Sequence, residues 1–180
     1  MKFTIRFAAQ ILFTLIFSFQ VFSQEAVSVA PIQEAPSIIS SIASLDETVK
    51  TVPCKNAERF EAAKKIFLDM GAKPEDVITE SFDKGKLSNV VVTKKGKTDE
   101  IIVIGAHYDK TSEGCGAIDN WTGIAIIAHL YKTLSKIETQ KTFVFVAFDQ
   151  EEKGLLGSDA MARSIPKEKR TQYCSMINFD

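Results

Sequence analysis

The chain has 180 residues, with 22 Lys and Arg against 23 Asp and Glu, which gives a formal net charge of −1. Hydrophobic residues make up 45% of the sequence and charged residues 25%, which is typical of a globular protein and excludes a disordered or collagen-like chain. The near-zero charge argues against a nucleic-acid-binding protein, because such proteins use clustered basic residues to neutralise phosphates.

The first 23 residues have the pattern of a cleavable secretory signal peptide. Lys2 and Arg6 supply a positive start, an apolar stretch covers residues 7–22, and no further charge occurs before Glu25. Cleavage after Ser23 would place the mature chain in the periplasm or outside the cell. The alternative is an uncleaved membrane anchor, because the uncharged stretch reaches the lower end of a spanning length. Polar residues within the stretch favour the signal peptide, so no stable membrane anchoring is expected.

The mature chain is expected to begin with a flexible leader at residues 24–36, which show no apolar periodicity. Apolar residues spaced four, three and four apart from Ile38 to Val49 predict an amphipathic helix. A second helix is predicted from Asn56, which can cap it, to Gly71, which can end it. Its expected buried stripe consists of Phe60, Ala63, Phe67 and Met70.

The remaining elements alternate between strands and helices. Strands are predicted at residues 77–82, 87–93, 101–104, 142–148 and 176–179, and helices at 121–136 and 158–164. The third and fourth strands are apolar on both faces, as a central sheet covered by helices requires. The pattern predicts an α/β fold with three α/β/α layers and a mixed, mostly parallel central sheet.

Three cysteines, Cys54, Cys115 and Cys174, are scattered without a zinc-finger spacing. An exported protein can form disulfides, but an odd number leaves at least one thiol unpaired or paired outside this chain. The sequence is compatible with one bridge or none, and with Cys115 as a small packing residue.

Acidic residues and one histidine follow the predicted core strands. They are His107 and Asp109 after the third strand, Asp119 before the next helix, Glu151 and Glu152 after the fourth strand, and Asp180 after the fifth. Ligands of open α/β sheets bind at the carboxyl ends of the strands, so these side chains are expected at one edge. One imidazole with several carboxylates suits zinc or another divalent transition ion.

Four short motifs occur in a recognisable order. They are Gly105–Asp109, Gly116–Gly123, Glu151–Ser158 and Asn178–Asp180. Together they resemble the co-catalytic di-zinc aminopeptidases of metallopeptidase family twenty-eight, of the bacterial leucyl aminopeptidase and aminopeptidase Y type, over roughly residues 57–180. The resemblance implies a zinc exopeptidase-like fold and a hydrolase that removes N-terminal residues from peptides with a free N-terminus.

The resemblance also implies a metal-ligand set. His107 would bind one zinc ion, Asp180 would complete the shell of that ion, Asp119 would bridge two ions, and Glu152 would bind the second. Two ions about 3.5–4 Å apart lower the pKa of a shared water and hold both nucleophile and oxyanion. The implied cofactor is therefore zinc, with two ions in a complete domain.

Two further acidic residues receive catalytic roles by the same resemblance. Glu151 corresponds to the general base, which takes a proton from the metal-bound water and passes it to the leaving amine. Asp109 corresponds to the carboxylate that orients the His107 ring.

The match has one departure. The second zinc of the family needs a further histidine from beyond the position of Asp180, and the other histidine of this chain, His129, is expected at a packing or surface position in the helix at 121–136. The sequence also ends on the last residue of a predicted strand. We therefore interpret residues 37–180 as the N-terminal portion of a zinc peptidase domain, incomplete at its C-terminus, and expect little or no activity from this chain alone.

Other interpretations stay open at this point. Asp119 alone can be an N-cap of the helix that follows it. Glutaminyl cyclases share this fold but use a single zinc ion for an acyl transfer, and an inactive binding domain of the same fold is a third possibility. The pattern at residues 119–123 together with the Glu151–Glu152 pair favours the aminopeptidase. The preferred N-terminal residue and the oligomeric state are not defined by the sequence.

Overall fold

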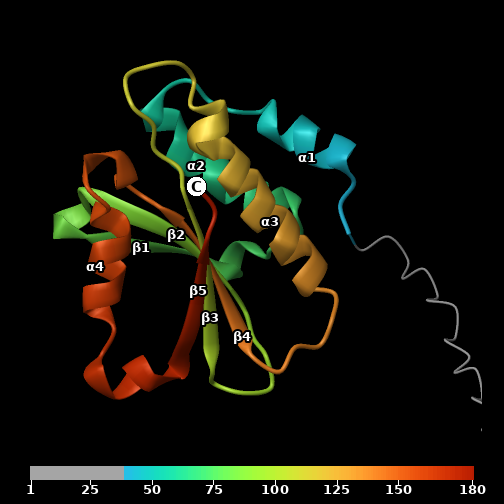
Figure 1. The fold of residues 1–180 in the computed structure, drawn as a ribbon, viewed down its shortest axis with the longest axis vertical. Coiled ribbons are helices and arrows are strands. Elements are labelled where there is room, and N and C mark those ends of the chain that lie inside the picture. Colours follow the sequence, from blue (N-terminus) through green and yellow to red (C-terminus); the bar gives the residue numbers. More distant parts are fainter. Residues whose placement is uncertain (1–38) are drawn as a thin grey trace, which may run out of the picture. The chain divides into compact units, whose positions relative to one another are not determined.

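A five-stranded sheet forms the centre of residues 39–180, the part of the chain that the computed structural model describes (Figure 1). Its strands are β1 (Val77–Phe82), β2 (Leu87–Lys94), β3 (Ile101–His107), β4 (Thr142–Phe148) and β5 (Tyr173–Asn178). They lie in the order β1-β2-β4-β3-β5. β2 is antiparallel to β1 and β4, whereas β3 is parallel to β4 and β5. All strands except β2 therefore run in one direction, so the sheet is mixed and mostly parallel, as predicted.

Helices cover both faces of this sheet. They are α1 (Ile42–Val49), α2 (Asn56–Asp69), α3 (Thr122–Leu134) and α4 (Leu156–Ser164). α2 and α3 pack on one face, α4 packs on the other, and α1 contacts α3 (Figure 1). This arrangement confirms the predicted α/β/α layers.

The side-chain alternation of the central strands explains why both faces are covered. On the α2 and α3 side, the buried strand residues include Val90, Val92, Ile104 and Phe145. On the α4 side they include Val91, Val103, Val144 and Val146. Successive residues of a strand point to opposite faces, so unbroken apolar runs fill both cores.

Several boundaries differ from the predicted ones. α1 begins at Ile42 rather than near Ile38, because the Ser41 side chain accepts a hydrogen bond from the Ser44 N–H and caps the helix there. β3 continues to His107, because its last residues keep the parallel register with β4 as far as Phe148. His107 is therefore part of the sheet.

Two predictions for single residues are also resolved. Asn56 does not cap α2, since it is the first residue of the helix and its side chain contacts Lys110 instead. Cys115 forms a disulfide with Cys54 rather than acting as a packing residue, and Cys174 is free and exposed.

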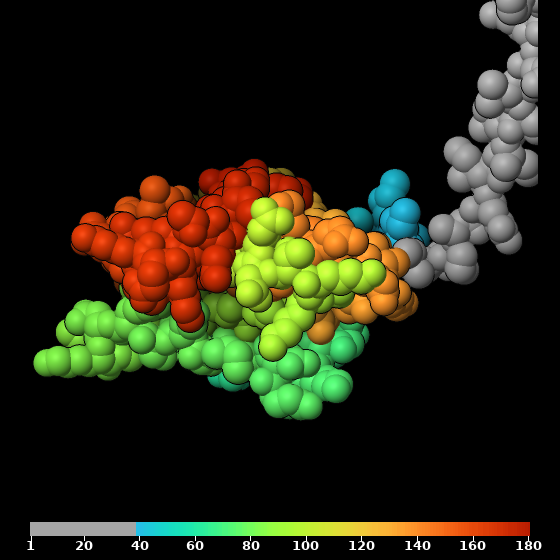
Figure 2. All heavy atoms as spheres, turned by 90° about the horizontal axis from the view of Figure 1, so that it is seen from below, coloured from blue at the N-terminus to red at the C-terminus, as the bar shows by residue number. Residues whose placement is uncertain are grey.

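Figure 2 shows the molecule from the end of the sheet at which β3, β4 and β5 begin. The connection between β2 and β3, yellow-green in this view, lies beside the residues that precede β4, in orange. Backbone hydrogen bonds join these segments, from Lys97 N–H to the Thr139 carbonyl (3.0 Å) and from Thr98 N–H to the Gln140 carbonyl (2.9 Å). The acidic residues predicted for the metal site lie at the opposite end of the sheet, where β3, β4 and β5 end.

The predicted signal peptide at residues 1–23 and the leader at 24–36 lie outside the described residues. Within residues 39–180, no helix is both long and apolar enough to cross a membrane.

Candidate metal centre

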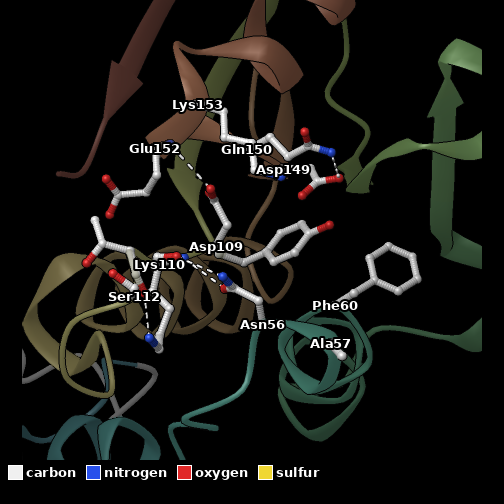
Figure 3. A pocket seen from close by; sticks show the side chains of 12 residues that line it. Asn56, Ala57, Phe60, Asp109, Lys110, Ser112, Asp149, Gln150, Glu152 and Lys153 are labelled. Carbon is white, nitrogen blue, oxygen red and sulfur yellow. Dashed lines mark hydrogen bonds between the residues drawn. The ribbon is translucent and has the colours of Figure 1, made fainter.

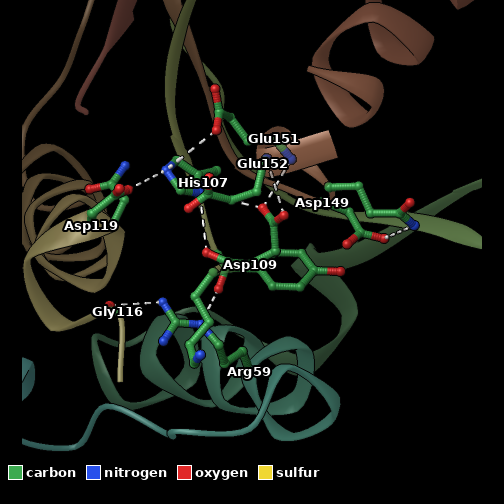
Figure 4. A network of polar contacts seen from close by, with 12 residues as sticks. Arg59, His107, Asp109, Gly116, Asp119, Asp149, Glu151 and Glu152 are labelled. Carbon is green, nitrogen blue, oxygen red and sulfur yellow. Dashed lines mark hydrogen bonds and ion pairs between the residues drawn. The ribbon is translucent and has the colours of Figure 1, made fainter. Parts of the chain in front are cut away.

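The predicted site residues meet at the carboxyl ends of β3, β4 and β5. His107 is the last residue of β3, a single helical turn at Glu151–Lys153 follows β4, and Asp180 is the second residue after β5. Asp119 comes from the segment between β3 and α3. Figure 4 shows the His107 ring between Asp119 on one side and Glu151 on the other.

The His107 ring is the buried centre of the group. Its Nε2 atom lies 3.0 Å from Asp119 Oδ1, 3.3 Å from Asp180 Oδ1 and 3.9 Å from Glu151 Oε2. The side chain of His107 is only 2% exposed, whereas those of Asp119 and Asp180 are 67% and 58% exposed. A buried imidazole thus lies at the base of an open acidic site.

Two overlapping groups of side chains could each hold a cation. The ligand atoms of His107, Asp119 and Asp180 lie within 4.8 Å of one another, and so do those of His107, Glu151 and Glu152. The first group is the set predicted for the first zinc ion. Asp119 and Glu152 fall in different groups that share His107, so the bridging role of Asp119 stays a prediction.

Glu152 supplies an independent sign that a cation fits. Its Oε1 atom is buried and has no hydrogen-bond partner among the described residues. A buried polar atom without a partner costs about 1–3 kcal/mol, which coordination of a cation would remove. Imidazole and carboxylate donors are those that zinc accepts. The residues present therefore fit a zinc ion.

Asp109 connects His107 with the turn that carries the two glutamates (Figure 4). Its Oδ1 atom lies 3.3 Å from His107 Nδ1 and accepts a hydrogen bond from the Glu151 N–H at 3.0 Å. Its Oδ2 atom accepts a weaker one from the Glu152 N–H at 3.3 Å. One buried carboxylate thus contacts two of the segments that carry predicted ligands, the end of β3 and the Glu151–Lys153 turn.

The charges of the site change the protonation of its members. Burial lowers the pKa of His107, but the hydrogen bond and charge of Asp109, with the charges of Glu151 and Asp119, outweigh burial and raise this pKa to about 9. Burial opposes ionisation of Asp109, but its hydrogen bonds with His107 and the Glu151 N–H keep its pKa below the ordinary value. Burial raises the pKa of Glu151. A metal ion must therefore displace a proton from His107.

Two buried asparagines, which the sequence analysis did not identify, hydrogen-bond to segments next to the site residues. Asn120 Nδ2 donates to the Phe179 carbonyl at 2.7 Å, which ties the residue after Asp119 to the end of β5. Asn89 Nδ2 donates to the Gly157 carbonyl at 2.9 Å, and its Oδ1 accepts from the Asp149 N–H at 3.1 Å. A polar residue inside the apolar run of β2 is the signal that could have identified Asn89.

Two cavities flank the candidate metal ligands. One of about 640 Å³ opens beside Glu152, with Phe60 and Tyr108 among its lining residues (Figure 3). The other, of about 430 Å³, is lined by His107, Glu151 and several apolar residues. The site is therefore open to a ligand on both sides of the glutamate turn.

Two alternatives for single residues are also decided. Asp119 does not cap α3, because Trp121 occupies the N-cap position and the Gly123 N–H donates a hydrogen bond to the side chain of Asn120 at 3.0 Å. His129 is buried between α1 and α3, with its Nε2 atom 2.8 Å from Thr48 Oγ1. Of the packing or surface position expected for His129, the structure shows the packing one.

Comparison with known proteins points to a family of peptidases. Peptidase family M28 matches residues 89–180, which include all members of both candidate metal-binding groups. Aminopeptidase Y of Saccharomyces cerevisiae is 31% identical over 96 residues, which cover 53% of this chain and 18% of that protein. The structure of a zinc aminopeptidase from Bacillus subtilis is similar, with a TM-score of 0.50 and 29% identity over 52% of this chain and 24% of that one.

A more distant likeness concerns the fold alone. A glutaminyl cyclase from Fimbriiglobus ruber has a TM-score of 0.58 at 18% identity, over 77% of this chain and 59% of that one. The chain spans less than a quarter of the length of the two aminopeptidases it resembles. Since the family match covers half of the sequence and includes His107 and its carboxylate neighbours, the chain belongs to peptidase family M28.

Proposed function

We propose that the chain carries metal-binding and catalytic residues of a zinc-dependent aminopeptidase, an enzyme that removes N-terminal residues from peptides. The observation that carries this proposal is the buried His107 ring, which faces Asp119, Asp180 and Glu151 at the carboxyl edge of the sheet. The relatives named zinc aminopeptidase and aminopeptidase Y support the same activity.

The ligand assignment follows the two groups of side chains. His107, Asp119 and Asp180 would hold one zinc ion, and Glu152, with Asp119 as a bridge, would hold a second. When bound, the ions supply Lewis acidity and a water of lowered pKa. The unpaired buried oxygen of Glu152 supports its place among the ligands.

Glu151 is proposed as the general base. It accepts a proton from the attacking water and donates it to the amine that leaves when the peptide bond breaks. The raised pKa of its carboxyl group, caused first by burial, brings its proton affinity closer to what this task needs near neutral pH. Asp109 holds the Glu151 backbone and the His107 ring, so we propose that it aligns base and ligand.

Preference for a free N-terminus is proposed from the relatives named aminopeptidase Y and zinc aminopeptidase. Asp119 and Asp180 are both more than half exposed, so a substrate can reach a metal ion that they would hold. We therefore propose an exopeptidase rather than an endopeptidase.

The proposal is tested with the full chain, zinc and two chromogenic substrates, leucyl-p-nitroanilide and its N-acetyl form. We expect slow release from the free-amine substrate only, and its loss on addition of a chelator. Turnover should be slow, because the two histidines of the chain leave the second zinc ion without a further imidazole. Equal release from both substrates, or release that the chelator leaves unchanged, would contradict the proposal.

The glutaminyl cyclase alternative is separated by a peptide that begins with glutamine. An aminopeptidase shortens this peptide by one residue, whereas a cyclase releases ammonia and leaves the chain length unchanged. Mass spectrometry distinguishes the two products. We expect the shortened peptide, and the cyclised product would favour the alternative.

A further inference from the structure

Arg59 is fully buried in the first turns of α2 and hydrogen-bonds to backbone carbonyls. Its Nε donates to the Tyr108 carbonyl, its Nη1 to those of Pro53 (3.1 Å) and Cys115 (2.8 Å), and its Nη2 to that of Gly116 (3.1 Å). Burial of a guanidinium is costly unless its donors find acceptors. The N–H groups of the Arg59 guanidinium thus find acceptors in three separate segments of the chain.

These acceptors lie next to the predicted metal ligands. Tyr108 is the residue after His107, and Gly116 lies three residues before Asp119. Figure 4 shows Arg59 below the site, with its bond to Gly116. A side chain at Gly116, whose φ is +58°, would come within 3.2 Å of Arg59 Nη1. The guanidinium therefore fits closely against the segment that leads to Asp119.

Two more residues, Asn56 at the start of α2 and Cys54 just before it, also contact residues 108–116. Asn56 Nδ2 donates to the Lys110 carbonyl at 2.7 Å, and its Oδ1 accepts from the Lys110 N–H at 2.9 Å (Figure 3). Cys54 is joined to Cys115 by the disulfide. We call Cys54, Asn56 and Arg59 the α2 clamp.

We propose that the α2 clamp positions residues 108–119 for metal binding, and that Arg59 is its central positioning residue. The metal part of this inference rests on the proposed function. Residues 108–116 contain no helix or strand, so their carbonyls need other partners where they are buried. A ligand segment held before the ion arrives binds it more tightly than one that the ion itself must order.

Arg59→Lys tests directly whether the several donors of the guanidinium group are needed. Lysine keeps the positive charge, but its single ammonium cannot reach the carbonyls of Tyr108, Cys115 and Gly116 together. In the full chain we expect Co²⁺ affinity, followed by the absorption of the bound ion, to fall about tenfold or more. Hydrogen–deuterium exchange of metal-free protein should become faster in residues 108–119 and stay unchanged in β4.

Phe67→Leu is the matched control for loss of stability. Phe67 lies on the buried side of the same helix, and its ring packs against those of Tyr131 and Phe145, which are outside residues 108–119. This substitution should lower the unfolding midpoint and leave Co²⁺ affinity unchanged. If Phe67→Leu weakened Co²⁺ binding as much as Arg59→Lys, Arg59 would have a merely structural role and the proposal would be wrong.

Asn56→Ala keeps the proposal testable if Arg59→Lys does not fold. It removes two hydrogen bonds at an exposed residue, and we expect severalfold weaker Co²⁺ binding with faster exchange in residues 108–119. If Co²⁺ affinity and the exchange of residues 108–119 are unchanged in the variants that fold, the proposal that the α2 clamp positions this segment is wrong. If the wild type bound no Co²⁺, the proposed function would fail, and the exchange data would still decide whether the clamp orders the segment.

Discussion

His107 belongs to both groups of side chains that could hold a metal ion, and its protonation controls whether either group can bind the ion. Without a metal ion its pKa is raised to about 9, mainly because the surrounding carboxylates overcome the effect of burial. A raised pKa means that the charged ring stabilises the metal-free fold fully below about pH 6.5, the ordinary value, and that this contribution is lost as the pH rises through about 9.

Proton NMR of the metal-free chain checks this directly. The chain has two histidines, and burial holds the pKa of His129 below its ordinary value, so the two rings should titrate on opposite sides of 6.5. We expect His107 to titrate near pH 9 and to stop titrating when zinc is added. A His107 signal that titrates below pH 7, or that zinc leaves unchanged, would contradict the site geometry.

The two adjacent glutamates should differ in what their loss removes. Glu151→Gln keeps the size of the side chain but removes the base, so metal content should survive while turnover falls by about 100-fold or more. Glu152→Gln should instead lower metal occupancy. Metal analysis and the chromogenic assay on the same preparations separate these effects, and the reverse pattern would mean that the two roles are exchanged.

The six residues assigned to the site were predicted from the motifs, because three motifs lie at the end of a strand whose apolar run is clear and the fourth, with Asp119, precedes a predicted helix. The residues that hold these segments were not. Arg59 lies four and eight residues before the buried Ala63 and Phe67, so its place on the buried stripe was visible in the sequence. Its acceptors are carbonyls of distant segments, and no sequence pattern encodes those contacts.

At the scale of elements, the predicted helices and strands are present as helices and strands. Their boundaries differ from the predicted ones where tertiary contacts determine where an element begins or ends. β3 runs on to His107 because each added residue pairs with β4, which the polarity of His107 does not reveal. β5 begins at Tyr173 rather than Met176, because Tyr173 already pairs with Ile101 in β3. The Glu151–Glu152 turn is held from outside by Asp109.

The link between α3 and β5 gives a prediction at this scale. Asn120→Ala removes the donor to the Phe179 carbonyl, which is partly buried, and the acceptor for the Gly123 N–H, which is buried. We expect unfolding in urea to become easier by about 1–3 kcal/mol. Zinc affinity should fall as well, because Asp180 follows Phe179 directly. Unchanged stability and affinity would show that this link does not hold the ligand.

At the scale of the whole described sheet, β5 is an edge strand with apolar side chains toward solvent. Met176 is 50% exposed and Ile177 is 48% exposed. An edge strand with unpaired backbone groups and exposed apolar side chains favours association between copies.

Sedimentation velocity tests this expectation. The wild-type chain should associate as its concentration rises, and Ile177→Thr, which keeps a β-branched side chain but is less apolar, should shift the chain toward monomer. A wild type that stays monomeric, or a variant that associates equally, would contradict it.

Zinc content after dialysis against metal-free buffer tests the central claim, that His107 and its carboxylate neighbours form a metal centre. The measurement compares zinc-loaded wild type with His107→Ala, a substitution that removes the ligand shared by both groups. The account predicts that the wild type retains zinc and that His107→Ala retains almost none while its circular dichroism spectrum is preserved. Equal zinc content in the two proteins would contradict it.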